Sequence, residues 1–189
     1  MDRLLDSYIV KHSNFLTPDI CNQTIDELKN TNWKQNVFYD SKSNLTRTLS
    51  GDLENDYSFD EKITTNKIIM DKLWKVIDDY IKKLDFEWFV GWQGYTTLRY
   101  NKYSENKKMA EHCDHINSIF DGERKGIPTL SIVGALNDDY EGGDFIMFKD
   151  KKIKLKQGDL ILFPSLFLYP HRVEPVFKGV RYSYVSWVY

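Results

Sequence analysis

The second half of the chain, from about residue 87, is a series of short β-type runs. β-branched and aromatic residues fill "GYTTLRY", "PTLSIVGAL", "FIMF", "DLILFP" and "YSYVSWV", and turn residues such as "NDDYEGGD" and "KQGD" separate them. About seven or eight short strands within about a hundred residues are typical of a β-sandwich or jelly roll. A parallel α/β sheet would need helices between these strands, and the spacing leaves no room for them.

The first half reads as helical. In "TPDICNQTIDELKNT", Thr17 is a plausible N-cap, with Pro18 at the first helical position. Residues 41–57 are polar and predict a surface loop. The following "SFDE" predicts a capping box, Ser58 to Glu61, at the start of a helix that runs to about residue 84. One apolar face of that helix has near-helical spacing and comprises Ile69, Leu73, Ile77, Tyr80 and Leu84.

The length of 189 residues suits a single domain over residues 1–189. We expect a mainly β fold, with helical support over about 1–86 packed on one sheet of a jelly-roll core over about 87–189. Cys21 and Cys113 are too few for a disulfide framework, and the N-terminus does not resemble a signal peptide, so we predict a cytoplasmic protein. No apolar run is long enough for a membrane span, and a net charge of −2 argues against a nucleic-acid or membrane partner.

Three residues are candidate metal ligands. The segment "AEHCDHINSIF" contains His112 and Asp114, and "LYPHRVEPV" contains His171. Taken alone, His-x-Asp reads equally well as a hydrogen-bonded turn. A hairpin or two could bring His171 back across a β-sandwich, and two imidazoles with one carboxylate then form the facial triad of non-haem Fe(II) oxygenases. A zinc hydrolase uses similar ligands, so the ligand types alone do not decide the metal.

Arg181 interrupts an apolar strand in "KGVRYSYVSW", which favours a binding role over a surface position. Since Gly179 permits a turn, Arg181 is expected on a strand that runs back beside His171, with its side chain in the same cavity. A guanidinium binds a carboxylate through two parallel hydrogen bonds. Ser183 shares the strand face of Arg181, and Tyr103, nine residues before His112, could reach the same carboxylate.

Four segments together resemble a known family over about residues 100–187. They are "YSENKKMAEHCD", "LNDDYEGGDFIMF", "KQGDLILFPS" and "PHRVEPVFKGVRYSYVSW". They are similar to the Fe(II)- and 2-oxoglutarate-dependent oxygenases, closest to the prolyl 4-hydroxylase group and its small bacterial and phage-encoded members. The resemblance implies a double-stranded β-helix. It also implies catalytic roles for its metal ligands His112, Asp114 and His171 and for Arg181, the anchor of the 2-oxoglutarate C5 carboxylate. Tyr103 would contact the cosubstrate.

The resemblance further implies hydroxylation of a prolyl residue in a peptide or protein, with Fe(II) and 2-oxoglutarate as cofactors and ascorbate as a reductant. Two alternatives stay open: an oxygenase acting on a small metabolite or nucleic acid, and a non-catalytic jelly-roll binding module. The sequence does not indicate an oligomeric state. One departure is Asn106, where members often have glycine.

Several neighbouring residues carry weaker predictions. Cys113 is expected to be a packed hydrophobe, His115 not to be a ligand, and Trp187 to lie in the core. Residues 115–127 are expected to form a mobile lid, because two glycines could serve as hinges. An aromatic-lined groove for a proline-rich chain is expected from Trp92, Tyr95, Tyr100, Tyr103, Phe167 and Tyr169.

Overall fold

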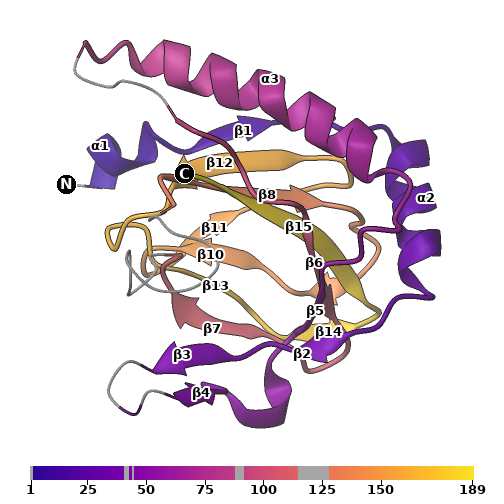
Figure 1. Ribbon diagram of the computed structural model, residues 1–189. Coiled ribbons are helices and arrows are strands. Elements are labelled where there is room, and N and C mark those ends of the chain that lie inside the picture. The colour runs from indigo at the N-terminus through magenta and orange to yellow at the C-terminus, as the bar shows by residue number, and fades with distance from the viewer. Residues whose placement is uncertain (1, 41–42, 44, 88–91, 115–127) are drawn as a thin grey trace.

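The computed structural model describes residues 2–40, 43, 45–87, 92–114 and 128–189, and two β-sheets stacked face to face form its body (Figure 1). Among these residues the larger sheet has seven strands, in the spatial order β1 (Val10–His12), β12 (Leu160–Pro164), β8 (Leu130–Ala135), β15 (Arg181–Val188), β6 (Arg99–Tyr103), β5 (Asp56–Ser58) and β2 (Lys34–Gln35). The smaller sheet has four, in the order β11 (Lys151–Ile153), β10 (Phe145–Met147), β13 (His171–Val173) and β7 (Met109–His112).

From β6 onward the chain alternates between the two sheets. It passes from β6 in the larger sheet to β7 in the smaller, then to β8, β10, β12, β13 and β15 in turn, and neighbouring strands in both sheets pair antiparallel. Two short pairs flank the sheets: β14 (Val176–Lys178) with β9 (Glu141–Gly142), and β3 (Phe38–Asp40) with β4 (Leu45–Arg47). This alternation is that of a jelly roll, so the predicted fold class is confirmed.

Helices α2 (Pro18–Leu28) and α3 (Asn66–Leu84) lie on the outer side of the larger sheet (Figure 1). A short helix α1 (Asp2–Asp6) and a 3-10 turn (Gly51–Leu53) complete the helical elements of the described residues. None of the helices in these ranges is long and apolar enough to cross a membrane. As predicted, the Thr17 side chain caps α2, accepting a hydrogen bond from the Ile20 N–H, and Pro18 opens the helix.

Two predictions for the first half are wrong. The capping box from Ser58 to Glu61 does not start α3, whose N-cap is Thr65. Ser58 instead ends β5 and pairs with Tyr100 of β6. Likewise the polar stretch 41–57 is not all loop, because it supplies β4, the 3-10 turn and most of β5. Strand pairing at a sheet edge uses backbone groups, so a polar sequence can join it without an apolar side-chain pattern.

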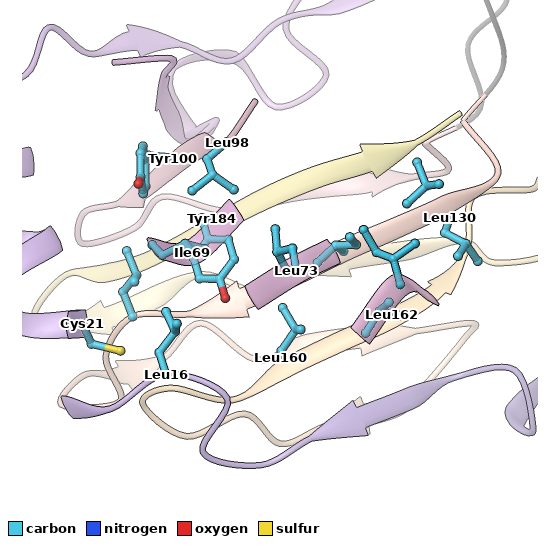
Figure 2. Close-up of a cluster of buried hydrophobic side chains, with 14 of the residues drawn as sticks. Leu16, Cys21, Ile69, Leu73, Leu98, Tyr100, Leu130, Leu160, Leu162 and Tyr184 are labelled. Carbon is cyan, nitrogen blue, oxygen red and sulfur yellow. The ribbon is translucent and has the colours of Figure 1, made fainter. Parts of the chain in front are cut away.

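A buried cluster joins the helices to the larger sheet (Figure 2). Ile69, Leu73, Ile77 and Tyr80 of α3 are buried, as the spacing predicted, and Leu84 is half-buried. They pack with Leu160, Leu162 and Tyr184 from the outer face of the sheet. Gly134 makes room for the Tyr184 ring, because a Cβ added there would lie 2.0 Å from Tyr184 Cζ. The helices thus cover the outer face of the larger sheet. The inner face of this sheet is left to form the second buried cluster and the candidate site.

A second cluster fills the space between the two sheets. Val133, Ile161 and Phe163 face inward from the larger sheet and meet Phe145 and Met147 of the smaller one. Alternation along each strand explains the division, since successive side chains point to opposite faces. On β15, for example, even-numbered Tyr184 and Val188 face the helices, whereas the odd-numbered residues from 181 to 187 line the interior. One end of this interior is hollow, and the candidate site lies there.

Candidate active site

The two candidate histidine ligands are direct neighbours in the smaller sheet. His112 ends β7 and His171 begins β13, and the two residues are register partners. Their ring centroids are 4.4 Å apart. Asp114 follows β7 by two residues, and its Oδ1 lies 3.4 Å from His112 Nε2 and 3.7 Å from His171 Nε2. The three ligand atoms lie within 4.8 Å of one another, so they can bind one metal ion.

The backbone sets the orientation of both imidazoles in the same way. His112 Nδ1 lies 2.8 Å from the Ala110 carbonyl oxygen, and His171 Nδ1 lies 3.1 Å from that of Tyr169. A carbonyl oxygen only accepts hydrogen bonds, so each Nδ1 carries the proton. Each Nε2 then presents a free lone pair toward Asp114. This is the form of imidazole that binds a metal, with the second nitrogen held by a hydrogen bond.

Asp114 is held as an anion by its neighbours. Its Oδ2 accepts a hydrogen bond of 2.5 Å from Ser131 Oγ, which also lies 2.8 Å from Ser165 Oγ. Burial alone would raise the pKa of Asp114, but the attraction that His171 and His112 exert on the carboxylate when they are protonated, together with the hydrogen bond from Ser131, outweighs it, so the pKa is lowered. Burial lowers the pKa of His171 to about 4, so this ring is neutral near pH 7. An ionised carboxylate beside a neutral imidazole suits a divalent cation.

Arg181 faces the histidines from the other sheet. It begins β15, is 2% exposed, and is the register partner of Tyr103 on β6. Its guanidinium carbon lies 4.9 Å from the centre of the Tyr103 ring, and its Nη1 donates a hydrogen bond of 3.1 Å to Ser183 Oγ. Among the ion pairs of the described residues none involves Arg181. A buried guanidinium without a carboxylate partner fits a site for an anionic ligand.

One prediction about Arg181 is wrong in its geometry. Its strand does not run beside that of His171, because β15 lies between β8 and β6 in the larger sheet, and β13 lies between β10 and β7 in the smaller. The intervening β14 pairs with β9 instead and allows the chain to change sheets. The expected shared cavity is nevertheless present, since Arg181 and His171 both line it from facing walls.

The cavity between these walls has a volume of about 160 Å³. All six residues predicted for the site line this cavity, and Ser183 and Tyr103 lie on the same side of it as Arg181. The predicted residues lining it are His112, Asp114, His171, Arg181, Tyr103 and Ser183. Sequence reasoning missed Asn36, Phe38 and Arg99, and placed Trp187 in the core although it lines the cavity. Arg99 could have been found by strand periodicity, because it shares the face of Tyr103 on β6.

Other residues near the triad have simpler positions. Cys113 is half-buried, with its Sγ 3.5 Å from the Phe167 carbonyl oxygen, and is not part of the ligand cluster. Asn106 has a φ of 66°, a left-handed conformation that asparagine tolerates better than most residues, so it can stand where relatives often have glycine. His115 and the expected lid, residues 115–127, lie outside the described residues.

The prediction of an aromatic-lined groove is wrong for most of the residues named for it. Of the six aromatic residues proposed for it, Tyr103 alone lines the cavity within the described part of the chain. Tyr100 is buried on the helix side, where Trp92 and Tyr95 pack as well. Tyr169 is buried between the sheets, and Phe167 is 71% exposed. Alternation on β6 explains Tyr100, since it points opposite to its neighbours Arg99 and Asn101.

A two-histidine, one-aspartate cluster in a jelly roll, with an unpaired buried arginine across the cavity, defines a mononuclear metal site of the facial-triad class. The comparison with protein families agrees: residues 98–189 match the model of the 2OG-Fe(II) oxygenase superfamily. These residues, which carry the whole metal cluster and Arg181, are therefore similar to the 2OG-Fe(II) oxygenase superfamily.

Curated relatives match about half of the chain. A PKHD-type hydroxylase of Aliarcobacter butzleri (strain RM4018) is 38% identical over 96 residues, which cover 47% of this chain and 41% of the relative. A PKHD-type hydroxylase of Crocosphaera subtropica is 35% identical over 98 residues, 49% of this chain and 42% of the relative. The matched segment thus spans less than half the length of these relatives.

Solved structures are similar over nearly the whole chain. A prolyl hydroxylase of Trichoplax adhaerens, in complex with a hypoxia inducible factor oxygen degradation domain peptide fragment, has a TM-score of 0.71 at 18% identity, covering 100% of this chain and 86% of that one. A viral collagen prolyl hydroxylase from Paramecium Bursaria Chlorella virus-1, in its 2OG complex, has a TM-score of 0.65 at 18% identity, covering 98% and 97%. At this identity the likeness establishes the fold.

Proposed function

We propose that this protein is an Fe(II)- and 2-oxoglutarate-dependent dioxygenase that hydroxylates a prolyl residue in a peptide or protein, and that residues 1–189 act as one domain. The observation that carries the proposal is the cavity itself. Two imidazole Nε2 atoms and one carboxylate face a common point on one wall, and an unpaired arginine faces them from the other. The ligand set suits Fe(II), and the arginine suits the far carboxylate of 2-oxoglutarate.

In this proposal each residue has a defined task. His112, Asp114 and His171 hold Fe(II) and leave open coordination positions. Arg181 binds the C5 carboxylate of 2-oxoglutarate, and Ser183 fixes the guanidinium by accepting its hydrogen bond. With iron and 2-oxoglutarate bound, O₂ would be the oxidant: one oxygen atom would convert a substrate C–H bond to C–OH, and the other would oxidise 2-oxoglutarate to succinate and CO₂.

The other cavity residues prepare and shield that chemistry. Ser131 holds Asp114 in place and supports its ionised form through the hydrogen bond to Oδ2. The Tyr103 ring lies against the Arg181 guanidinium, with the geometry of a cation–π contact. Val133 and Phe145 line the cavity with apolar surface and limit the access of water. The chain therefore contributes positioning and exclusion of water, and the cofactors contribute the oxidation.

Support for a prolyl substrate comes from the relatives and the cavity wall. The similar structures are prolyl hydroxylases, one with a bound peptide fragment. Phe38 and Trp187 also line the cavity, and their rings provide an apolar surface on which a pyrrolidine ring can pack. A metabolite or nucleic-acid substrate is the alternative, and a non-catalytic binding module is the second alternative. A peptide or protein partner in the cytoplasm, with ascorbate as reductant, belongs to the same proposal.

The test is to incubate the protein with proline-containing peptides, Fe(II), ascorbate and 2-oxoglutarate, and to look by mass spectrometry for one added oxygen on proline. The His171→Ala variant is the matched control and should produce none, because the metal loses one of its three protein ligands. Peptides that stay unmodified, beside strong turnover of free proline or a methylated oligonucleotide, would favour the first alternative. No consumption of 2-oxoglutarate under any of these conditions would favour the second.

A further inference from the structure

A second arginine, which is half-buried, lines the cavity, and none of the tasks described so far uses it. Arg99 begins β6, and its guanidinium stacks on the Tyr57 ring, 4.4 Å from the ring centre. Its Nη2 donates a hydrogen bond of 2.7 Å to Asn36 Oδ1. None of the ion pairs between described residues involves Arg99. A cation that is largely withdrawn from water is costly unless a charged or strongly polar group meets it.

Two hydrogen-bond donors at this place have no partner. Arg99 Nε and Asn36 Nδ2 are both buried and make no hydrogen bond with the described residues, and both residues line the cavity. Buried donors are nearly always satisfied in native proteins, so an unpaired pair beside a cavity points to a ligand that brings acceptor atoms. The hydrogen bond from Arg99 to Asn36 holds the two side chains together, so a single ligand group can accept hydrogen bonds from both.

Arg99 and Arg181 lie at opposite ends of one sheet face. In the pairing of β6 with β15, Arg181 lies opposite Tyr103, and Arg99 lies opposite Val185. Four residues along β15 therefore separate the two arginine positions, which is about 13 Å at the usual rise per residue. A cosubstrate that reaches from the metal to Arg181 leaves the Arg99 end of this face to the substrate.

Arg99 is also within electrostatic reach of the metal ligands. Burial lowers the pKa of Arg99, and the charges of Tyr103, Tyr57 and Asp114 act in the opposite direction. The charge of Arg99 acts in turn on His112. Arg99 lines the same cavity as His112 and Asp114, so a group bound by Arg99 would share that cavity with the metal ligands.

The charges that line the cavity indicate the sign of the missing group. Within the described part of the chain, the charged side chains that line the cavity are Arg99, Arg181 and Asp114. Fe(II) and the 2-oxoglutarate dianion cancel each other, so the loaded site has one positive charge without a counter-ion. A carboxylate supplies one negative charge and two planar oxygens, which match the fork of a guanidinium. A phosphate dianion would bring a second negative charge that this cavity does not balance.

We propose that Arg99 and Asn36 form a subsite for a carboxylate of the substrate, which deepens the proposed function and rests on it. A prolyl compound can bring this carboxylate in two ways. It is either the α-carboxylate of a C-terminal proline or the side chain of an acidic residue beside the proline. Both share the chemistry that Arg99 recognises, and the substrates of this protein are then acidic near the hydroxylated ring.

The test measures binding without turnover, by calorimetry of the Fe(II)- and 2-oxoglutarate-loaded protein in the absence of oxygen. Two matched pairs of probes separate the sources of the carboxylate: acetyl-proline with acetyl-prolinamide, and acetyl-Pro-Asp-amide with acetyl-Pro-Asn-amide. We expect the acid of at least one pair to bind about tenfold more tightly than its amide partner, a difference of about 1.4 kcal/mol. Arg99→Gln should abolish this preference and leave 2-oxoglutarate affinity unchanged, and Arg99→Lys should keep part of it.

Two further variants make the result specific. Lys102→Gln removes a cation from the same strand whose ammonium lies over the Trp33 ring, away from the cavity, and should bind every probe as the original protein does. Asn36→Asp places a carboxylate beside Arg99 and should abolish the preference with the arginine still present. It also serves as the test if Arg99→Gln does not fold, which thermal unfolding will reveal.

Equal affinity for acid and amide in both pairs would overturn the subsite. So would an Arg99→Gln variant that loses 2-oxoglutarate binding in place of the acid preference, because Arg99 would then belong to the cosubstrate. Acetylglycine and acetylglycinamide separate this proposal from the proposed function. An Arg99-dependent preference for acetylglycine, with no hydroxylation of any prolyl compound, would keep the carboxylate subsite and remove the prolyl substrate.

Discussion

Removal of the Ser131 hydroxyl should weaken metal binding without unfolding the protein. Ser131 is fully buried on β8, and its Oγ donates a hydrogen bond of 2.5 Å to Asp114 Oδ2. A hydrogen bond to a charged group contributes about 1.5–3 kcal/mol. At about 1.4 kcal/mol for each factor of ten, its loss corresponds to metal affinity about 10- to 150-fold weaker, in line with other outer partners of metal ligands.

The assay is a titration with Mn(II), an oxygen-preferring divalent ion, in which the unbound ion is followed by electron paramagnetic resonance. Ser165→Ala removes the neighbouring hydroxyl but keeps the Ser131–Asp114 contact, so its effect should be smaller. Ser186→Ala is the matched control. It is a buried serine whose Oγ donates to the Thr96 carbonyl oxygen at 2.7 Å, on the helix side of the sheet. A Ser131→Ala protein that folds normally and binds Mn(II) within about twofold of the original would refute the reasoning.

Three more perturbations test the site and the packing behind it. Arg181→Ala should weaken 2-oxoglutarate binding by about 2–5 kcal/mol, and Arg181→Lys by less. A titration of 2-oxoglutarate into the oxygen-free Fe(II) protein measures both affinities. Unchanged affinity in the alanine variant would exclude Arg181 as the residue that binds the C5 carboxylate. Gly134→Ala should lower the free energy of unfolding by about 1–3 kcal/mol in urea, because its Cβ would lie 2.0 Å from Tyr184 Cζ; an unchanged midpoint would contradict the packing. Cys113→Ser should keep Mn(II) affinity, since the thiol is not in the ligand cluster, and a folded variant without affinity would assign it a role.

The strands of the second half could be predicted because their local pattern is strong. "PTLSIVGAL", "DLILFP" and "YSYVSWV" contain β8, β12 and most of β15, and each is β-branched or aromatic with turn residues at its ends. The face of α3 was predictable for a similar reason, since Ile69, Leu73 and Ile77 recur at helical spacing. In both cases the apolar residues recur with the period of the strand or helix. The sequence alone therefore indicates which face of the element is buried, even though the element packed against it is not known.

What the sequence could not give is the assignment of strands to sheets. His171 and Arg181 are ten residues apart, yet they lie in different sheets, because β14 carries the chain across between them. Short segments such as β5 pair through backbone groups at an edge, and no side-chain pattern marks that event. Strand periodicity places Arg99 on the same face as Tyr103, but "TTLRYNKY" alone does not show that this face lines the cavity, which follows from the register with β15.

The division of the site between two sheets has a mechanical consequence. The two histidine ligands belong to the smaller sheet and Asp114 follows its strand β7, whereas Arg99 and Arg181 belong to the larger sheet. A cosubstrate held by the metal at one end and by Arg181 at the other would connect the two sheets. Each ligand that binds the folded protein alone raises its stability, by about 2.7 kcal/mol at a hundredfold excess over Kd. The melting temperature should thus rise further when 2-oxoglutarate joins the metal than with the metal alone, and Arg181→Ala should remove this second increment while sparing the first.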